Sequence, residues 1–281
     1  MTIKLGENSY GKSRVRLLRV VRQEGRHDIK EATFGIRFEG DFETAHTKGE
    51  NRKILPTDTM KNTVYALARQ YPVEAIEDFC QHLGEHFLTY NPQVSQVRID
   101  ASETLWARIP HGGKPHASAF VRGGEEKRTA MLGATREGTT IRAGIDDLIV
   151  LKTTKSAFEG FLRDPYTTLK EDRDRILSTV IHADWLYDGG EIEFGPTWHG
   201  VRQSLLESFA EHDSLSLQHT LYAMGEAVLA SFDRISEIHL SLPNKHYNKV
   251  DLSAFGMDNP AEVFLPTDEP YGSIEATLRK E

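Results

Sequence analysis

The stretch TDTMKNTVYALARQYPVEAIEDFCQHLGEHFL, residues 57–88, predicts two consecutive amphipathic helices around which the rest of the fold is organised. Apolar residues recur every three or four positions in Thr57–Tyr71 and again in Glu74–Leu88, which is the spacing of a helix with one buried face. The Tyr71-Pro72 step separates the two helices, because proline interrupts a helix. The predicted buried stripes are Met60, Val64, Leu67 and Tyr71 in the first helix and Ile76, Phe79, Leu83 and Phe87 in the second.

Strand-like segments flank this helix pair on both sides, and the same order of elements returns in the second half of the chain. Strands joined without helical crossovers favour antiparallel pairing. The sequence therefore predicts an α+β fold of two ββααββ halves, residues 1–136 and 137–281, alike in pattern but not in sequence and joined near Arg136-Glu137-Gly138. The first-half strands are predicted at Val15–Val21, around Ile36, at Val97–Ile109 and at Ala117–Arg122. The second-half elements are predicted as strands Leu148–Thr153, Leu177–Tyr187, Ile235–Leu242 and Gly272–Leu278 and helices His199–Ala210 and Ser216–Phe232.

A half of this kind has helices on one face of its sheet, and its other face needs a cover. Its edge strands also present unpaired backbone groups. Self-association into a closed, barrel-like oligomer would solve both problems, so we expect an oligomer.

The composition limits the class of protein. The chain has 281 residues, of which 38% are hydrophobic and 27% charged, with a net charge of -8 and a pI of about 5.9. An acidic balance argues against a non-specific nucleic-acid binder, but not against a small anionic substrate. No apolar run reaches the length of a membrane span, and no secretory signal is visible. The single cysteine, Cys80, cannot form an intrachain disulfide or a cysteine-rich zinc site, which fits a cytoplasmic protein.

Several short polar stretches are candidates for chemistry, and each also has an ordinary structural interpretation. Lys12 is most simply a solvated strand end, and Thr57 or Asp58 is most simply the N-cap of a helix. Arg175 lies in a charged segment, and Gln218 lies at a helix start where it would face solvent. The chain contains no visible catalytic triad, P-loop or dinucleotide fingerprint, and the His111 to His116 loop matches no standard zinc spacing.

Taken together, these stretches resemble motifs of the urate oxidase (uricase) family, in the same order and from near the start of the chain to its last sixth. The motifs are Tyr10-Gly11-Lys12, Thr57-Asp58 with Lys61-Asn62-Thr63, Gly160-Phe161-Leu162-Arg163-Asp164, Tyr166-Thr167-Thr168-Leu169-Lys170, Asp174-Arg175-Ile176-Leu177-Ser178-Thr179 and Leu242-Pro243-Asn244-Lys245-His246-Tyr247.

The resemblance implies the tunnelling fold, in which ββααββ halves pair into a barrel and two barrels stack into a homotetramer around a tunnel. It implies oxidation of urate by O2 to 5-hydroxyisourate with release of H2O2, and it implies no metal and no organic cofactor. Active sites would lie at subunit interfaces, and the partners would be urate and O2 rather than nucleic acid or membrane.

The resemblance also implies which residues bind the purine. Arg175 and Gln218 would grip its edge, where a guanidinium offers a planar fork and an amide both donates and accepts. Phe158 would stack on the ring. The backbone N–H of Leu217 would donate to the ring, although the family usually has valine at this position. Asp58, together with Thr57, would come from the neighbouring subunit.

The remaining implied residues handle oxygen and protons. Asn244 would hold O2, and then water, above the urate plane. His246 would end a proton relay that runs through Thr57 to Lys12. Asn244 and His246 are two positions apart, so in an extended segment both side chains point to one side.

Two alternatives stay open at this point. One is a zinc-dependent pterin synthase or cyclohydrolase with the same fold, and the other is an inactive purine-binding oligomer. The chain ends in Thr277-Leu278-Arg279-Lys280-Glu281, without a peroxisomal Ser-Lys-Leu-type tail, so we expect a cytoplasmic enzyme.

Overall fold

The computed structural model describes residues 3–281 and divides into two compact units. The first unit runs up to Gly144 and includes Gly189–Pro196, and the second consists of Ile145–Asp188 and Thr197–Glu281. The division at residues 136 and 137 stays a prediction. Among residues 3–281, every helix falls short of the length and apolar character that crossing a membrane requires.

The first unit contains an antiparallel sheet in the order β1-β2-β3-β4. Two long helices lie between its second and third strands in the chain, as predicted, and a short helix precedes them. The elements are β1 (Tyr10–Gln23), β2 (Arg26–Gly40), α1 (Glu43–Lys48), the 3-10 turn Asn51–Lys53, α2 (Thr57–Gln70), α3 (Ile76–Tyr90), β3 (Val94–His111) and β4 (Lys114–Ala134).

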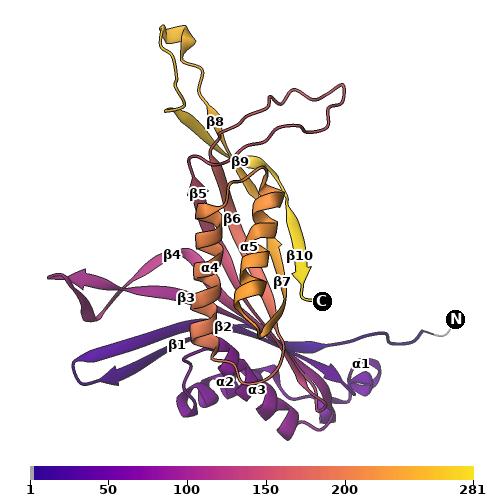
Figure 1. Ribbon diagram of the computed structural model, residues 1–281. Helices are drawn as coiled ribbons and strands as arrows, with labels where there is room; N and C mark the ends of the chain where they lie inside the picture. The colour runs from indigo at the N-terminus through magenta and orange to yellow at the C-terminus, as the bar shows by residue number, and fades with distance from the viewer. Residues whose placement is uncertain (1–2) are drawn as a thin grey trace. The chain divides into compact units, whose positions relative to one another are not determined.

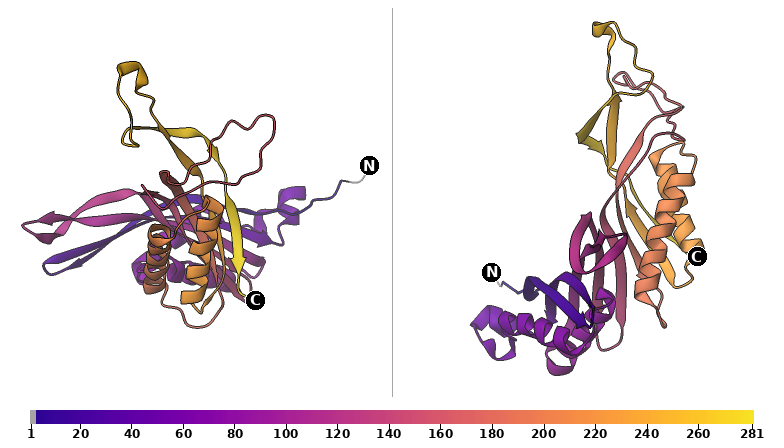
Figure 2. Two further views of the ribbon diagram at one scale, coloured as in Figure 1. Left: turned by 45° about the horizontal axis from the view of Figure 1, so that its top comes forward. Right: turned by 90° about the vertical axis from the view of Figure 1, so that its left-hand side faces the viewer.

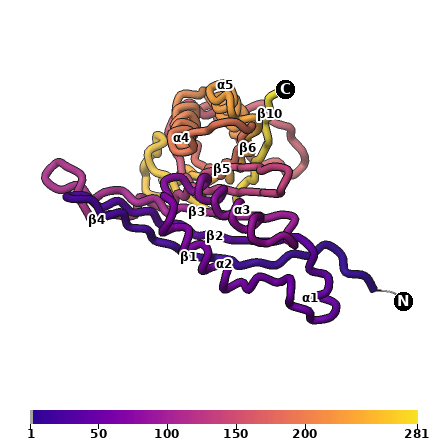
Figure 3. Tube along the Cα trace, turned by 90° about the horizontal axis from the view of Figure 1, so that it is seen from below, coloured from indigo at the N-terminus to yellow at the C-terminus, as the bar shows by residue number. Residues whose placement is uncertain are grey.

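The core of the first unit forms where the two helices meet the sheet, and Figure 3 shows α2 and α3 lying along β1, β2 and β3. Alternate side chains of β2 face the helices, as the period of a strand requires. The Phe34 ring meets that of Phe79 at 5.2 Å between centroids, and the Phe38 ring meets that of Phe87 at 5.1 Å. The predicted α3 stripe is confirmed, because all four of its members are fully buried. In α2 the stripe holds for Met60, Val64 and Leu67, whereas Tyr71 lies just after the helix end and is exposed.

The second unit repeats the order of the first with one addition, a hairpin formed by β8 and β9. Its strands pair antiparallel in the order β6-β7-β10, and β8 pairs with both β6 and β9. Helices α4 and α5 lie side by side on one face of these strands (Figure 1 and Figure 2, right). The elements are β5 (Thr139–Lys152, shared by both units), β6 (Leu177–Tyr187), α4 (Phe194–Glu211), α5 (Leu217–Ser231), β7 (Ile235–Ser241), β8 (Asn244–Lys249), the 3-10 turn Ser253–Phe255, β9 (Phe264–Gly272) and β10 (Glu275–Arg279).

The structure confirms the α+β class, the antiparallel sheets and the repeated order of elements, and it corrects some boundaries. Strand β4 continues past Arg122 to Ala134, because the Gly123-Gly124 pair lies within the strand instead of ending it. Strand β9 has no counterpart among the predicted strands, and it contains two prolines, which are uncommon within a strand. The strand predicted at Gly272–Leu278 is replaced by the end of β9 and by β10.

Candidate functional site

The predicted site residues fall into two groups, one in each unit. Lys12, Thr57 and Asp58 lie in the first unit. The residues predicted to bind purine and oxygen all lie in the second: Phe158, Arg175, Leu217, Gln218, Asn244 and His246.

In the first unit, Lys12 lies on β1 opposite Ile36 of β2 and is half-buried. Gly11 before it is required by a close approach of the two strands, because a Cβ at this position would lie 1.8 Å from the Ile36 carbonyl oxygen. After Lys12 the register shifts, and Arg14 in this bulge has a positive φ of 57°. A bulge re-aims the side chains beside it, so Lys12 sits between a tight strand contact and a local kink.

Thr57 and Asp58 are the first two residues of α2. The expectation that one of them caps the helix is wrong, because Pro56 is the N-cap and, among residues 3–281, no side chain makes a capping bond. The Asp58 carboxylate instead accepts from Lys61 Nζ at 2.5 Å and from Asn62 Nδ2 at 3.0 Å. These contacts with Lys61, and less strongly Asn62 and the charge of Lys12, lower the pKa of Asp58. Lys12 is therefore close enough to the start of α2 for its charge to act there.

In the second unit, main-chain hydrogen bonds connect three segments that are distant in sequence. These segments are residues 155–158 after β5, residues 172–175 before β6 and residues 214–216 before α5. The bonds run from Ala157 N–H to Ser214 O at 2.7 Å, from Ser214 N–H to Lys155 O at 3.0 Å, from Arg175 N–H to Ser156 O at 2.8 Å and from Phe158 N–H to Asp172 O at 2.7 Å. Figure 1 shows this loop region, the start of α5 and β8 at the same end of the unit.

These three hydrogen-bonded segments form a frame. Within it, the Arg175 guanidinium lies over the Phe158 ring, with Cζ 5.1 Å from the ring centroid. Its Nε is buried and has no hydrogen-bond partner among the described residues. Burial lowers the pKa of Arg175, while the charge of Asp172 acts in the opposite direction. A buried donor without an acceptor is costly, and an acceptor supplied by a ligand would satisfy it.

The N-terminus of α5 lies in the same frame. Ser216 is its N-cap and accepts from the His219 N–H at 3.1 Å. Leu217 and Gln218 are the first two helical residues, and the first N–H groups of a helix have no partner within it. These N–H groups lie at the positive end of the helix dipole, which favours a bound anion. Leu217 is buried and the Gln218 side chain is exposed.

Strand β8 brings Asn244 and His246 to this end of the unit. Asn244 pairs with Thr179 and Lys245 with Ser178, so β8 runs antiparallel to β6 and back towards Arg175. The extended backbone places Asn244 and His246 on one face of β8. Lys245, between them, donates to Asp268 at 2.8 Å.

A buried cluster of hydroxyl groups, which was not predicted, lies at the segments joined by these main-chain hydrogen bonds. Ser214 and Thr220 are buried, and the Thr220 hydroxyl donates to Ser214 Oγ at 2.7 Å. Ser156 is also buried, and its hydroxyl has no partner among the described residues. Isolated serines and threonines carry no sequence signal that could have identified these positions.

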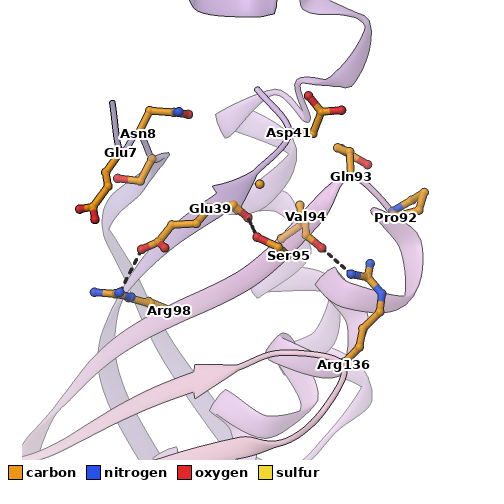
Figure 4. A pocket seen from close by; sticks show the side chains of 12 residues that line it. Glu7, Asn8, Glu39, Asp41, Pro92, Gln93, Val94, Ser95, Arg98 and Arg136 are labelled. Atoms are coloured by element: carbon orange, nitrogen blue, oxygen red, sulfur yellow. Dashed lines mark hydrogen bonds and ion pairs between the residues drawn. The ribbon is translucent and has the colours of Figure 1, made fainter. Parts of the chain in front are cut away.

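Other polar groups on the surface do not coincide with the predicted residues. In the described chain, one cluster has metal-ligand spacing, Asp146, Asp147 and His182, and it shares no residue with the predicted site. An open depression of about 900 Å³ in the first unit is also separate (Figure 4). There Arg98 pairs with Glu39 at 3.1 Å, and Arg136 donates to a backbone carbonyl, so these charges serve the structure.

Comparisons with known proteins agree with the motifs. The family model described as Uricase matches residues 8–132 and 141–275. A uricase of Arthrobacter globiformis is 47% identical over 99% of this chain and 91% of its own length. A uricase of Aspergillus flavus is 40% identical over 96% of this chain and 94% of its own length. The crystal structure of the Arthrobacter globiformis uricase covers 100% of this chain and 96% of its own, with a TM-score of 0.95 and 47% identity.

Proposed function

The chain belongs to the uricase family, and from that premise we propose how its residues carry out the oxidation of urate. The enzyme is an oxidoreductase with O2 as electron acceptor. Urate, O2 and water are converted to 5-hydroxyisourate and hydrogen peroxide. The observation that supports the placement of urate is the buried, unpartnered Nε of Arg175 beside the Phe158 ring.

Urate binds in the second unit with its ring against Phe158 and its anionic edge towards Arg175. A guanidinium is suited to this edge because its fixed fork of N–H groups forms strong hydrogen bonds with anions. The Leu217 N–H and the Gln218 amide complete the contacts at the start of α5. Burial strengthens these electrostatic contacts relative to water, and they favour the more highly charged form of urate, which is the better electron donor.

Asn244 holds O2 over the urate ring and later holds the water that adds to the oxidised ring. Positioning both reactants converts an encounter in solution into a reaction between neighbours. His246, on the same face of β8, ends a relay that takes protons by way of Thr57 to Lys12. Imidazole is suited to this role because its charge changes near neutral pH.

The relay is tested with Lys12→Met and Thr57→Ala, and with Lys48→Met as a matched control on the exposed end of α1. We expect both relay variants to lower kcat strongly while urate binding, measured without O2, stays within a few-fold of the parent. The control keeps the parent kcat. Parent-like turnover in either relay variant would show that the relay is assigned wrongly.

The enzyme needs no metal or organic cofactor in this proposal. The test uses protein treated with a strong chelator and checked by elemental analysis, followed by the loss of urate absorbance in air with detection of peroxide. Full activity is expected in metal-free protein. Activity that returns only with added zinc, iron or copper would contradict the proposal.

The two groups of site residues come together between neighbouring subunits of a homotetramer, with the first unit of one subunit facing the second unit of the other. Co-expression of Lys12→Met and Arg175→Leu chains tests this arrangement, because a mixed pair contains one site in which both residues are intact. Random pairing in a two-fold symmetric interface predicts recovery of about a quarter of the parent activity. No recovery would place each site within a single chain.

We also propose that the enzyme works in the cytoplasm. Fractionation of cells that produce it tests this, with the activity expected in the cytoplasmic fraction. Activity confined to membranes or to the exterior would be the contrary result.

A further inference from the structure

Tyr10, the first residue of β1, is hydrogen-bonded to the segment that leads into α2. The Tyr10 hydroxyl oxygen accepts a hydrogen bond from the Leu55 N–H at 2.9 Å. The Tyr10 ring packs edge-on against Phe42, at 4.8 Å between centroids, and against Phe38, at 5.8 Å. The ring is therefore packed on two sides, and moving its hydroxyl away from Leu55 would break the contacts with Phe42 and Phe38.

This bond joins the two elements that carry the proposed relay. Lys12 is two residues beyond Tyr10, and Thr57 is two residues beyond Leu55. Between Tyr10 and Lys12, Gly11 approaches β2 so closely that an added Cβ would lie 1.8 Å from the Ile36 carbonyl oxygen. The ladder with β2 is interrupted after Lys12 and resumes at Val15. The tyrosine is therefore the last side-chain anchor before the lysine on this strand.

The start of α2 carries the polar residues Thr57 and Asp58, which the hydrogen bond between Tyr10 and Leu55 can align. Asp58, next to Thr57 at the start of α2, accepts from Lys61 and from Asn62, and Thr57 is half-buried. Burial raises the pKa of Tyr10, and the bond from Leu55 opposes this. The phenol therefore stays neutral near neutral pH, and its oxygen remains an acceptor for the Leu55 N–H.

We infer that Tyr10 is a positioning residue for proton transfer, whose hydroxyl fixes the distance between the Lys12 strand and the Thr57 helix. The inference rests on the proposed relay and adds to it a residue that touches neither urate nor O2. It assigns a function to Tyr10, the first residue of the Tyr10-Gly11-Lys12 motif.

The experiment compares Tyr10→Phe, Lys12→Met and the double variant in the full-length enzyme, with Tyr90→Phe on the exposed end of α3 as the matched control. Loss of one aligning hydrogen bond is expected to lower kcat about threefold to tenfold, with KM unchanged within about twofold. In the Lys12→Met background, Tyr10→Phe should have no further effect, because the group that it positions is absent. The control should behave as the parent does.

The outcomes separate this inference from the proposed function. A parent-like kcat in Tyr10→Phe, or an equal loss with and without Lys12, overturns the positioning role but leaves the relay intact. A parent-like kcat in Lys12→Met removes the relay and the inference together. If Tyr10→Phe does not fold, hydrogen exchange of the Leu55 amide in the parent decides instead: protection supports the anchor, and free exchange overturns it.

Discussion

Replacing Arg175 by leucine is expected to weaken urate binding and to stabilise the fold, which is an unusual combination. Arg175 Nε is buried without a partner among the described residues, and burial lowers the pKa of its guanidinium. The side chain thus carries a cost in the unliganded protein, which the charge of Asp172 offsets in part and a bound anion would offset further. Leucine keeps much of the apolar stem and removes the charge.

The two effects can be estimated from the contacts. An unsatisfied buried donor costs about 1–3 kcal/mol, whereas the lost contact with the Phe158 ring is worth about 0.5–1 kcal/mol at a partly exposed site. The donor cost prevails, so we expect Arg175→Leu to gain about 1 kcal/mol and to raise Tm by about 2–4 °C. Two charge-assisted hydrogen bonds to urate, at about 1.5–3 kcal/mol each, predict a loss of about 10²- to 10⁴-fold in kcat/KM.

The measurement pairs urate kinetics in air with thermal unfolding of the ligand-free protein. Arg173→Leu is the matched control, because that arginine is exposed and pairs with the exposed Glu159 at 2.8 Å. The control should keep the parent kcat/KM. A Tm for Arg175→Leu that falls by several degrees, or an unchanged kcat/KM, would refute the reasoning.

Three further predictions follow from single contacts. Gly11→Ala should lower kcat more than tenfold or prevent folding, as checked by turnover and circular dichroism, because its Cβ would lie 1.8 Å from the Ile36 carbonyl oxygen. Arg128→Met leaves the buried Glu77 carboxylate unpaired and should cost about 3–5 kcal/mol in urea unfolding, given that Arg128 Nη2 lies 2.7 Å from it; a parent-like midpoint would contradict this. Phe158→Leu should raise the KM for urate about threefold to tenfold through lost aromatic stacking, and an unchanged KM would argue against stacking there.

Much of the fold was predictable because it rests on periodic burial. The α3 stripe and the full span of β6, Leu177–Tyr187, follow directly from apolar spacing. The β8–β9 hairpin was not predictable on this basis. Its strands are mostly polar or half-exposed, and Pro266 and Pro270 lie within β9. A strand with few buried side chains lacks the alternation of apolar and polar residues from which a strand is predicted.

The candidate site shows a similar division. The motifs made Arg175 and Asn244 candidates because their neighbours form uncommon strings, but the contacts that position them come from the chain's three-dimensional path. Neither the bond between Tyr10 and Leu55 nor the cluster of Ser214 and Thr220 involves neighbours in sequence. Only folding brings such partners together, so one sequence cannot reveal them.

The frame of the second unit that is proposed to bind the purine is joined through N–H and C=O groups of the main chain. Every amino acid supplies both groups, except that proline lacks the N–H, so the frame does not depend on which side chains it carries. Exchanging Leu217 for valine, or Phe158 for another aromatic residue, would alter the side chains that line the proposed pocket while leaving the main-chain hydrogen bonds of the frame unchanged. Laboratory evolution towards differently substituted purines can therefore proceed by single side-chain replacements, without rebuilding the scaffold that presents them.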